Sequence, residues 1–486
     1  MATTNPKVMG YLPQDVPPFG KMVLLGFQHV LTMFPATVLC AVLMHFDVST
    51  VLAVTGFGTI VALVGAKLSM GNYIPLYYGS SFSYIAAVAS VMGQLEPGLG
   101  YGAVAKPETI AIVQAGFVAT GIINILVGLL IRVTGGKKGL DKVLPPIITG
   151  SVACTIGIGL GFSALQMASG AFSGQDYAAS DAATQVFKIG IPAAAIGLKW
   201  WCASIVTFLA AVLLSVYLQG KGFIGMLPIL LAGIVGYLVA IPLGLVNPQF
   251  TTPFISLPRL TFPDFSNPLT VTVLFSVGIM CIATIPESTA HLYQISLYVD
   301  HLAQEQGREK VFLAQYVGLN LMLDGLDDLI NGLFGSTAGT NYGENNSLMV
   351  ITRNYSGASL ITAGAIAIIL GFIGPVKDAV TSLPTAVVGG LAIYLYGVIG
   401  MQGIALMIAE KVDLYDPGKL AIGAMILIVG IGGNIGYPNG LPIPLLQKIF
   451  VGGWPPIATG AVLGILINLI FVAFKPPVVR STDVLE

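Results

Sequence analysis

Apolar runs follow one another along nearly the whole chain, separated by short breaks that contain Gly, Pro or charged residues. A helix needs about 20 mostly apolar residues to cross a hydrocarbon core about 30 Å thick. The runs predict about fourteen membrane-spanning segments, at residues 21–44, 50–68, 72–93, 108–133, 143–163, 198–219, 223–245, 269–297, 312–334, 338–353, 357–374, 379–405, 417–434 and 455–474. We therefore predict an all-α polytopic membrane protein that has no separate soluble domain.

The composition supports this class. Of the 486 residues, 55% are hydrophobic and 9% are charged, whereas Asp, Glu, Lys and Arg make up about 25% of a soluble domain. The four cysteines lie inside apolar runs, and no C-x-x-C pair indicates a metal or redox site. The net charge of -1 implies neither nucleic acid nor an anionic surface as a partner. We expect no cofactor, no metal and no catalytic residue.

The basic residues favour one orientation in the membrane, because cytoplasmic loops are enriched in Lys and Arg. If both termini are cytoplasmic, most of the 21 Lys and Arg residues fall on that side. The exceptions are Lys106, Lys188, Lys199, Arg259, Lys377 and Lys448. We predict a multi-pass protein of the inner (plasma) membrane with cytoplasmic tails at 1–20 and 475–486 and ordinary outer surface loops at 167–189 and 246–268.

Two pairs of sequence echoes indicate an internal repeat. "LPPIITG" at 144–150 is echoed by "LPTAVVG" at 383–389, and "YYGSSFSYIAA" at 77–87 is echoed by "NYGENNSLMVI" at 341–351. In both pairs the partners are seven spans apart, which favours two seven-span halves. Because seven is odd, the second half is inverted, an arrangement typical of secondary transporters.

The third and tenth spans are short and interrupted by Gly. Each predicts an extended segment, at 72–79 and 336–343, followed by a half-helix. Irregular backbone at membrane depth is tolerated where it is packed in protein or lines a cavity. Two half-helices entering from opposite faces would direct their N-terminal N–H groups at one point. The alternative is a pair of flexible kinks with a capping residue.

Ionisable residues inside the membrane are the strongest candidates for a functional site, because a charge at the bilayer centre costs at least about 2.5–3.5 kcal/mol. The deepest are Glu287, His291, Glu344 and His29. Glu287 and His291 are four residues apart on one helix face, so their side chains can meet and hold or pass a proton. The alternative is a structural charge pair that fixes helix packing.

Each remaining polar candidate has a structural alternative. Glu344 stands where an acidic residue also serves as a helix cap. Gln28 and His29 lie in an apolar run, where packing or hydrogen bonding is the commoner role. We expect three aspartates to be interfacial and without a substrate role: Asp324, Asp327 and Asp328.

Two carboxylates that face two backbone-donor half-helices select a particular ligand. The carboxylates accept N–H groups and the helix N-termini donate to carbonyl oxygens. A small planar molecule with alternating N–H and C=O groups fits, so uracil and other oxo-nucleobases are the predicted ligands. Phe82, Tyr78 and Tyr342 are predicted to cover the ring faces.

At these residues the sequence resembles the nucleobase-ascorbate transporter (nucleobase-cation symporter) family, and within it the bacterial uracil permeases. The resemblance runs through "GFQHVLTMFPATVL", "YGSSFSYI", "ESTAH" and "FGSTAGTNYGENNSLMVITR". The family signature, an acidic or amide residue followed by N-x-G-x(4)-T-[R/K/G], is matched by Glu344, Asn345, Thr352 and Arg353. Ser347 replaces its glycine.

The resemblance implies roles for individual residues. Glu287 and Glu344 would bind the base, His291 would support Glu287 in proton coupling, and the backbone of Phe82 and Gly343 would complete the pocket. The pocket would also include Tyr342, Ser81 and Ala36, with Gln28, His29 and Asn345 in support. Purine-specific members usually carry glutamine in place of Glu344 and aspartate in place of His291, so uracil is predicted over xanthine.

The resemblance also implies an architecture. The core domain would comprise residues 21–133 and 269–374, and the gate domain residues 143–245 and 379–474. The protein would be a homodimer through the gate domain, and would import uracil by proton symport and alternating access. The rivals are a purine permease of the same family, an anion transporter of the same fold, which the carboxylate of Glu344 disfavours, and a membrane-embedded enzyme using Glu287 and His291 as acid and base.

Overall fold

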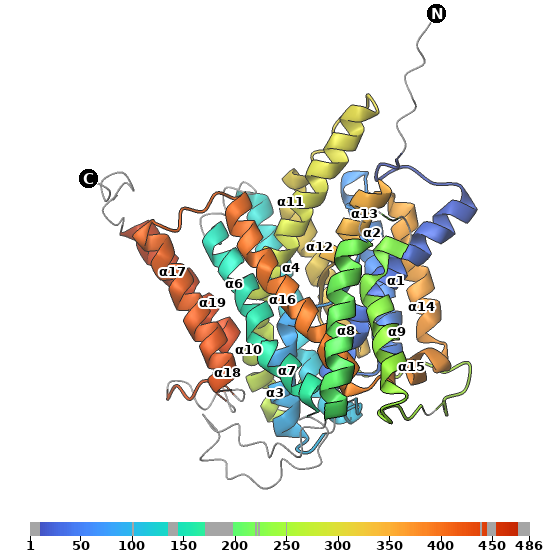
Figure 1. Cartoon of the computed structure of the whole chain (residues 1–486). Coiled ribbons are helices and arrows are strands. Elements are labelled where there is room, and N and C mark those ends of the chain that lie inside the picture. The colour runs from blue at the N-terminus through green and yellow to red at the C-terminus, as the bar shows by residue number, and fades with distance from the viewer. Residues whose placement is uncertain are drawn as a thin grey trace, which may run out of the picture.

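The computed structural model describes residues 10–99, 102–134, 144–170, 198–218, 221, 224–248, 250–437, 440–444 and 453–474 (Figure 1). The predicted tail at 475–486 and most of the predicted loop at 167–189 lie outside these residues. The helices and strands are α1 (Phe19–Leu43), α2 (Val48–Met70), β1 (Tyr78–Ser80), η1 (Phe82–Tyr84), α3 (Ile85–Leu95), α4 (Pro107–Thr134), α6 (Pro146–Gly159), α7 (Gly161–Ser169), α8 (Leu198–Tyr217), η3 (Ile224–Met226), α9 (Pro228–Ala240), α10 (Pro268–Ser276), η4 (Gly278–Met280), α11 (Cys281–Glu305), η5 (Leu313–Tyr316), α12 (Val317–Phe334), β2 (Gly339–Asn341), α13 (Gly343–Thr352), α14 (Gly357–Gly371), α15 (Gly374–Thr381), α16 (Thr385–Ala409), α17 (Pro417–Leu427), η6 (Ile428–Gly432), α18 (Gly433–Gly436) and α19 (Pro456–Ala473).

Long apolar helices dominate the described part of the chain, where eight helical segments are long and apolar enough to cross a membrane. They are α1, α2, α4, α6–α7, α8, α16, α17–α18 and α19. Local sequence sets their ends: α2 begins where Asp47 accepts the backbone N–H of Thr50 at 3.0 Å and ends at Gly71, which has φ 72°. The prediction of a helical polytopic membrane protein is confirmed.

The two predicted extended segments lie side by side. β1 pairs antiparallel with β2, with Tyr78 opposite Asn341, Gly79 opposite Thr340 and Ser80 opposite Gly339. Each strand satisfies the backbone groups of the other inside the protein. β1 leads into η1 and α3, and β2 leads into α13, so the chain enters a helix directly after the crossing on both sides.

Glycines allow several helix pairs to approach closely. A Cβ atom on Gly121 of α4 would lie 2.6 Å from the Gly325 carbonyl oxygen of α12, and one on Gly325 would lie 2.6 Å from that of Gly121. Gly56 of α2 and Gly364 of α14 are related in the same way, at 2.6 and 2.7 Å. Small residues allow such backbone contact between membrane helices. These pairs are therefore tightly packed units.

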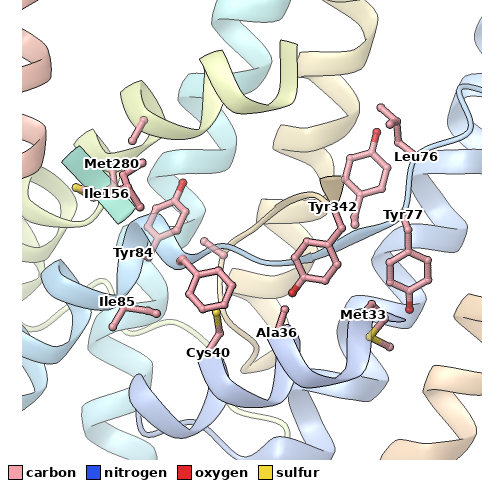
Figure 2. Close-up of a cluster of buried hydrophobic side chains, with 14 of the residues drawn as sticks. Met33, Ala36, Cys40, Leu76, Tyr77, Tyr84, Ile85, Ile156, Met280 and Tyr342 are labelled. Atoms are coloured by element: carbon pink, nitrogen blue, oxygen red, sulfur yellow. The ribbon is translucent and has the colours of Figure 1, made fainter. Parts of the chain in front are cut away.

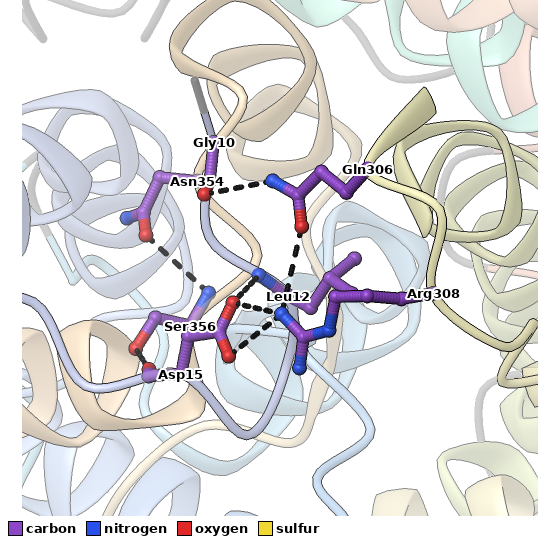
Figure 3. Close-up of polar contacts among 7 residues, drawn as sticks. All are labelled: Gly10, Leu12, Asp15, Gln306, Arg308, Asn354 and Ser356. Carbon is purple, nitrogen blue, oxygen red and sulfur yellow. Dashed lines mark hydrogen bonds and ion pairs between the residues drawn. The ribbon is translucent and has the colours of Figure 1, made fainter. Parts of the chain in front are cut away.

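The N-terminal segment, predicted as a cytoplasmic tail at 1–20, is docked onto the helices from residue 10 onward. The N–H of Tyr11 donates to the Arg353 carbonyl at 2.9 Å, and the N–H of Tyr355 donates to the Tyr11 carbonyl at 2.8 Å. Arg308 donates to both carboxylate oxygens of Asp15, at 2.9 and 2.7 Å (Figure 3). This short segment thus ties the start of α1 to the ends of α11 and α13.

The connection before α10 is exposed, as predicted for 246–268, but its backbone is attached to several helices. The N–H and hydroxyl of Thr252 donate to Asp378 of α15 at 2.8 and 2.5 Å. These bonds hold the pKa of the Asp378 carboxyl below its usual range. Further along, Gln114 of α4 donates to the Thr261 carbonyl at 2.9 Å. The connection is therefore a bonded strap rather than an ordinary surface loop.

Three aspartates of α12 were expected at the membrane interface, and this prediction is wrong. Asp324, Asp327 and Asp328 are 1%, 0% and 0% exposed. α12 packs against both α2 and α4, and this neighbourhood supplies polar partners. Asp328 accepts the Asn124 amide at 2.9 Å and the backbone N–H of Gly339 at 2.7 Å. Asp328 of α12 thus supports β2 directly and is itself held by Asn124 of α4.

Candidate functional site

Three of the predicted polar residues meet where α11 passes the start of α13. Glu287 and His291 lie on α11, and Glu344 lies in the first turn of α13. All three are half-buried, unlike the aspartates of α12, so they retain accessible surface. The two glutamates are close enough for their charges to repel each other. The described residues offer neither of them a cation or a hydrogen-bond donor as a partner.

His291 is held by β2 rather than by Glu287. Its Nδ1 lies 2.8 Å from the Asn341 carbonyl oxygen and 2.9 Å from the Asn341 Oδ1. A Cβ on Gly343 would lie 2.7 Å from its Nε2, so the other edge of the ring faces the start of α13. The sequence predicted that Glu287 and His291 can meet, yet in the described part of the chain no hydrogen bond or ion pair joins them.

Tyr342 is fixed directly beneath the strand crossing. Its hydroxyl donates to the Ser80 carbonyl at 2.9 Å and lies 2.9 Å from the Thr37 hydroxyl of α1. A Cβ on Gly79 would lie 2.5 Å from its ring, so the glycine of the first Tyr-Gly pair makes room for the tyrosine of the second. Figure 2 shows Tyr342 between the strand segment and α1, near Ala36.

The aromatic candidates divide into two groups. Phe82, which is 8% exposed, packs edge-on against Tyr396 of α16, with ring centroids 5.7 Å apart and an interplanar angle of 81°. Tyr78 instead lies fully buried beside Asp324 and Asp327. Phe82 therefore contacts α16, whereas Tyr78 lies against the aspartates of α12. The sequence did not predict the contact with Tyr396, because a tyrosine in an apolar run carries no signal of its own.

Ser81 and Ala36, the small residues of the predicted pocket, are both buried. The N–H of Ser81 donates to the Ala338 carbonyl at 3.0 Å, beside the strand pair. Ala36 lies on α1, one helical turn from Cys40, whose thiol is close enough to interact electrostatically with both glutamates. These positions place α1 and the β1 end against the same space as Glu287 and Glu344.

The predicted supporting residues connect α1 to α13. Asn345 donates to the His29 carbonyl and lies within hydrogen-bonding distance of its Nδ1, both at 3.1 Å. Gln28 is 8% exposed. Ser347, which stands where the family signature has glycine, donates from its hydroxyl to the Gly343 carbonyl at 3.1 Å. The serine therefore forms a bond with the first residue of α13.

The arrangement suits a ligand that donates hydrogen bonds. Two accessible carboxylates can accept N–H groups, and the first turn of α13 offers free backbone N–H groups to a carbonyl oxygen. An anion would meet two acidic side chains there and no cation among the described residues. Within the described residues no group of three or more His, Cys, Asp or Glu could hold a metal ion.

Comparison with known proteins gives a consistent result. A model of the Permease family of xanthine and uracil permeases matches residues 20–437. The uracil permease of Bacillus caldolyticus is 30% identical over 470 residues, covering 94% of this chain and 93% of that protein. The uracil permease of Escherichia coli K12 is 33% identical over 430 residues, covering 86% of this chain and 87% of that protein.

Solved structures share the fold at low sequence identity. The transmembrane domain of the cyanobacterium bicarbonate transporter BicA matches with a TM-score of 0.59 at 14% identity, covering 94% of this chain and 99% of that domain. The murine anion transporter Slc26a9 in its inward-facing state matches with a TM-score of 0.60 at 11% identity, covering 95% and 69%. At such identities the likeness concerns the fold alone.

Proposed function

Because this chain belongs to the xanthine/uracil permease family, we propose that it imports uracil by proton symport. It is a multi-pass membrane transporter and not an enzyme. The observation that carries the substrate proposal is the pair of accessible carboxylates, Glu287 and Glu344, beside the first turn of α13. Two curated relatives at 30% and 33% identity are uracil permeases.

A planar base fits these groups in a specific way. Uracil presents two ring N–H groups and two carbonyl oxygens along its edge, so each glutamate can accept one N–H while backbone N–H groups donate to an oxygen. A neutral ligand is also not repelled by the two acidic side chains. Phe82 and Tyr342 would cover the ring faces, and the contact of Phe82 with Tyr396 would close the site from α16.

For the transport cycle we propose fourteen spans in two inverted halves. Residues 21–133 and 269–374 would form the core domain, and residues 143–245 and 379–474 the gate domain. The closely packed α2–α14 and α4–α12 pairs lie within the core domain, and this packing supports movement of the core domain as a unit. Movement of the core domain past α16 would open the site to one side of the membrane and then to the other. We further propose a dimer through the gate domain and cytoplasmic termini.

The test is uptake of labelled uracil into proteoliposomes under an imposed pH gradient. We expect uptake that rises with an inward proton gradient, competes with unlabelled uracil more strongly than with xanthine, and is lost in Glu344→Gln. Glu309→Gln, an exposed glutamate after α11, is the matched control. Uptake that ignores the gradient would refute proton coupling, and uptake of xanthine instead of uracil would refute the substrate.

A further inference from the structure

The protonation pattern of His291 can be derived from its neighbours. Its Nδ1 lies 2.8 Å from the backbone carbonyl oxygen of Asn341, and a carbonyl oxygen can only accept a hydrogen bond. Nδ1 must therefore carry a hydrogen, whether the imidazole is neutral or charged. In the neutral ring Nε2 is then the bare nitrogen, and it faces Gly343 at the start of α13.

The side chain of Asn341 reinforces this pattern. Its Oδ1 lies 2.9 Å from the same Nδ1, and its Nδ2 donates to the Ser288 hydroxyl at 2.7 Å. If the amide were flipped, two donors would face each other at the imidazole. Because the backbone carbonyl has already fixed Nδ1 as a donor, the amide orientation follows and Ser288 receives the N–H.

Ser288 links Asn341 to α12 by hydrogen bonds. Its oxygen also accepts the Asn320 amide at 2.9 Å, so both of its lone pairs are engaged and its own proton needs an acceptor. The carboxyl group of Asp324 lies beside this hydroxyl and is 1% exposed. Neither oxygen of Asp324 has another partner in the described part of the chain. A small rotation of the Ser288 hydroxyl would complete a series of hydrogen bonds from His291 through Asn341 and Ser288 to Asp324.

We propose that Ser288 and Asn341 are positioning residues that fix Nδ1 of His291 as a donor and thereby make Nε2 the atom that exchanges the transported proton. On uptake an O–H bond of a hydronium ion breaks as the N–H bond forms at Nε2, and on release the N–H bond breaks as an O–H bond forms on water or a carboxylate, with no change of oxidation state. This assignment of a proton to the transport cycle rests on the proposed function, whereas the tautomer itself does not.

The groups around His291 are consistent with an exchange on the Nε2 side. Glu344 of α13 acts on it electrostatically, Glu287 lies one helical turn before it on α11, and Asp324 lies beside Ser288 on α12. The helices α6 and α19, which also pack against α11, carry no charged residue. Glu344, which follows Gly343 in the chain, thus lies on the side where a proton leaving Nε2 could be received.

The first experiment is nitrogen NMR of the purified full chain labelled with ¹⁵N-histidine. The chain has four histidines, and the His291→Gln variant identifies the His291 signals. We expect the neutral ring to carry its hydrogen on Nδ1. The population of this form should fall in Ser288→Ala and in Asn341→Ala, which weaken or remove the side-chain acceptor, while the backbone carbonyl of residue 341 keeps it the main form. A wild-type His291 found with its hydrogen on Nε2 would overturn the proposal.

The second experiment separates positioning from folding. In Ser288→Ala we expect proton-driven uracil uptake to fall several-fold and its pH profile to shift, while uracil binding and uracil exchange at equal pH remain. Ser288→Thr, which keeps the hydroxyl, should restore the wild-type profile, and Ser276→Ala, a buried serine of α10 bonded within its own helix, is the control. An unchanged profile in Ser288→Ala would overturn the proposal. If wild-type protein carries no uracil, the proposed function fails while the NMR result still decides the tautomer.

Discussion

The substitution Gly343→Ala tests the geometry of the site with a single methyl group. The new Cβ would lie 2.7 Å from Nε2 of His291, 3.3 Å from Cε1 and 3.4 Å from Cδ2. Ordinary contacts of this kind begin near 3.4 Å. The imidazole would therefore have to retreat by about 0.7 Å or rotate.

The ring has little freedom to retreat. Its Nδ1, on the opposite edge of the ring, bonds to Asn341 at 2.8 and 2.9 Å. A retreat from α13 would compress these bonds, and a rotation would misalign them. Overpacking of this size costs about 1–3 kcal/mol. We therefore expect the affinity for uracil to fall by about 5- to 150-fold, because the same displacement moves the first residue of α13.

The assay is isothermal titration of uracil into purified protein, together with the midpoint of thermal unfolding. Gly397→Ala is the matched control, because a Cβ on this glycine of α16 meets no atom within 4 Å. It should bind uracil normally and unfold at the same or a slightly higher temperature. Wild-type affinity in a folded Gly343→Ala protein would refute the close approach of His291 to α13.

Four further predictions test other parts of the structure. Asp328→Ala should destabilise the fold by about 1–3 kcal/mol for each donor left unpaired, measured by thermal unfolding, and a wild-type midpoint would contradict its role at β2. Leu12→Ala should cost about 2–5 kcal/mol in the same assay, since this side chain is 3% exposed and packs in the core. Folding lowers the pKa of Asp378, so this carboxylate stabilises the fold above the usual carboxyl range, and the stabilisation is lost as pH falls through the lowered pKa. In Thr252→Val the midpoint of thermal unfolding should therefore depend less on pH across the acid range. Tyr396→Ala should weaken uracil binding by titration more than Tyr396→Phe, which keeps the ring against the site, and equal losses would contradict a role for the ring.

Periodicity and composition were sufficient to place the helices along the sequence but not to predict which segments contact each other. A run of about 20 apolar residues has one stable conformation in a bilayer, so segments such as α2 and α4 could be placed to within a few residues. The echo of Tyr78-Gly79 in Tyr342-Gly343 located the two extended segments as well. Pairing between them, with Gly79 receiving the ring of Tyr342, depends on the three-dimensional crossing and leaves no mark in local sequence.

The docked N-terminal segment was missed for a related reason. Its sequence is polar and rich in proline, a composition that usually indicates a tail. The bonds of Tyr11 to Arg353 and Tyr355 join residues more than three hundred positions apart in the chain. Asn341 was missed because its partner, His291, was assigned to Glu287 from helical spacing alone. Spacing on one helix shows which side chains can meet but not which acceptor lies closer.

Burial and pairing separate four of the intramembrane carboxylates into two kinds. Asp327 and Asp328 are fully buried and each has a donor as a partner: Asp327 accepts the Asn331 amide on its own helix, and Asp328 accepts the backbone N–H of Gly339 in β2. Their role is therefore structural. Glu287 and Glu344 are accessible and unpaired within the described residues, so their hydrogen-bonding capacity is available to a ligand. Replacing the first kind should therefore lower the midpoint of thermal unfolding at any ligand concentration. Replacing the second kind with glutamine should leave that midpoint unchanged without ligand, and should abolish the rise that saturating uracil produces in the wild type. A glutamine variant that unfolds early without uracil would place that glutamate with the structural carboxylates.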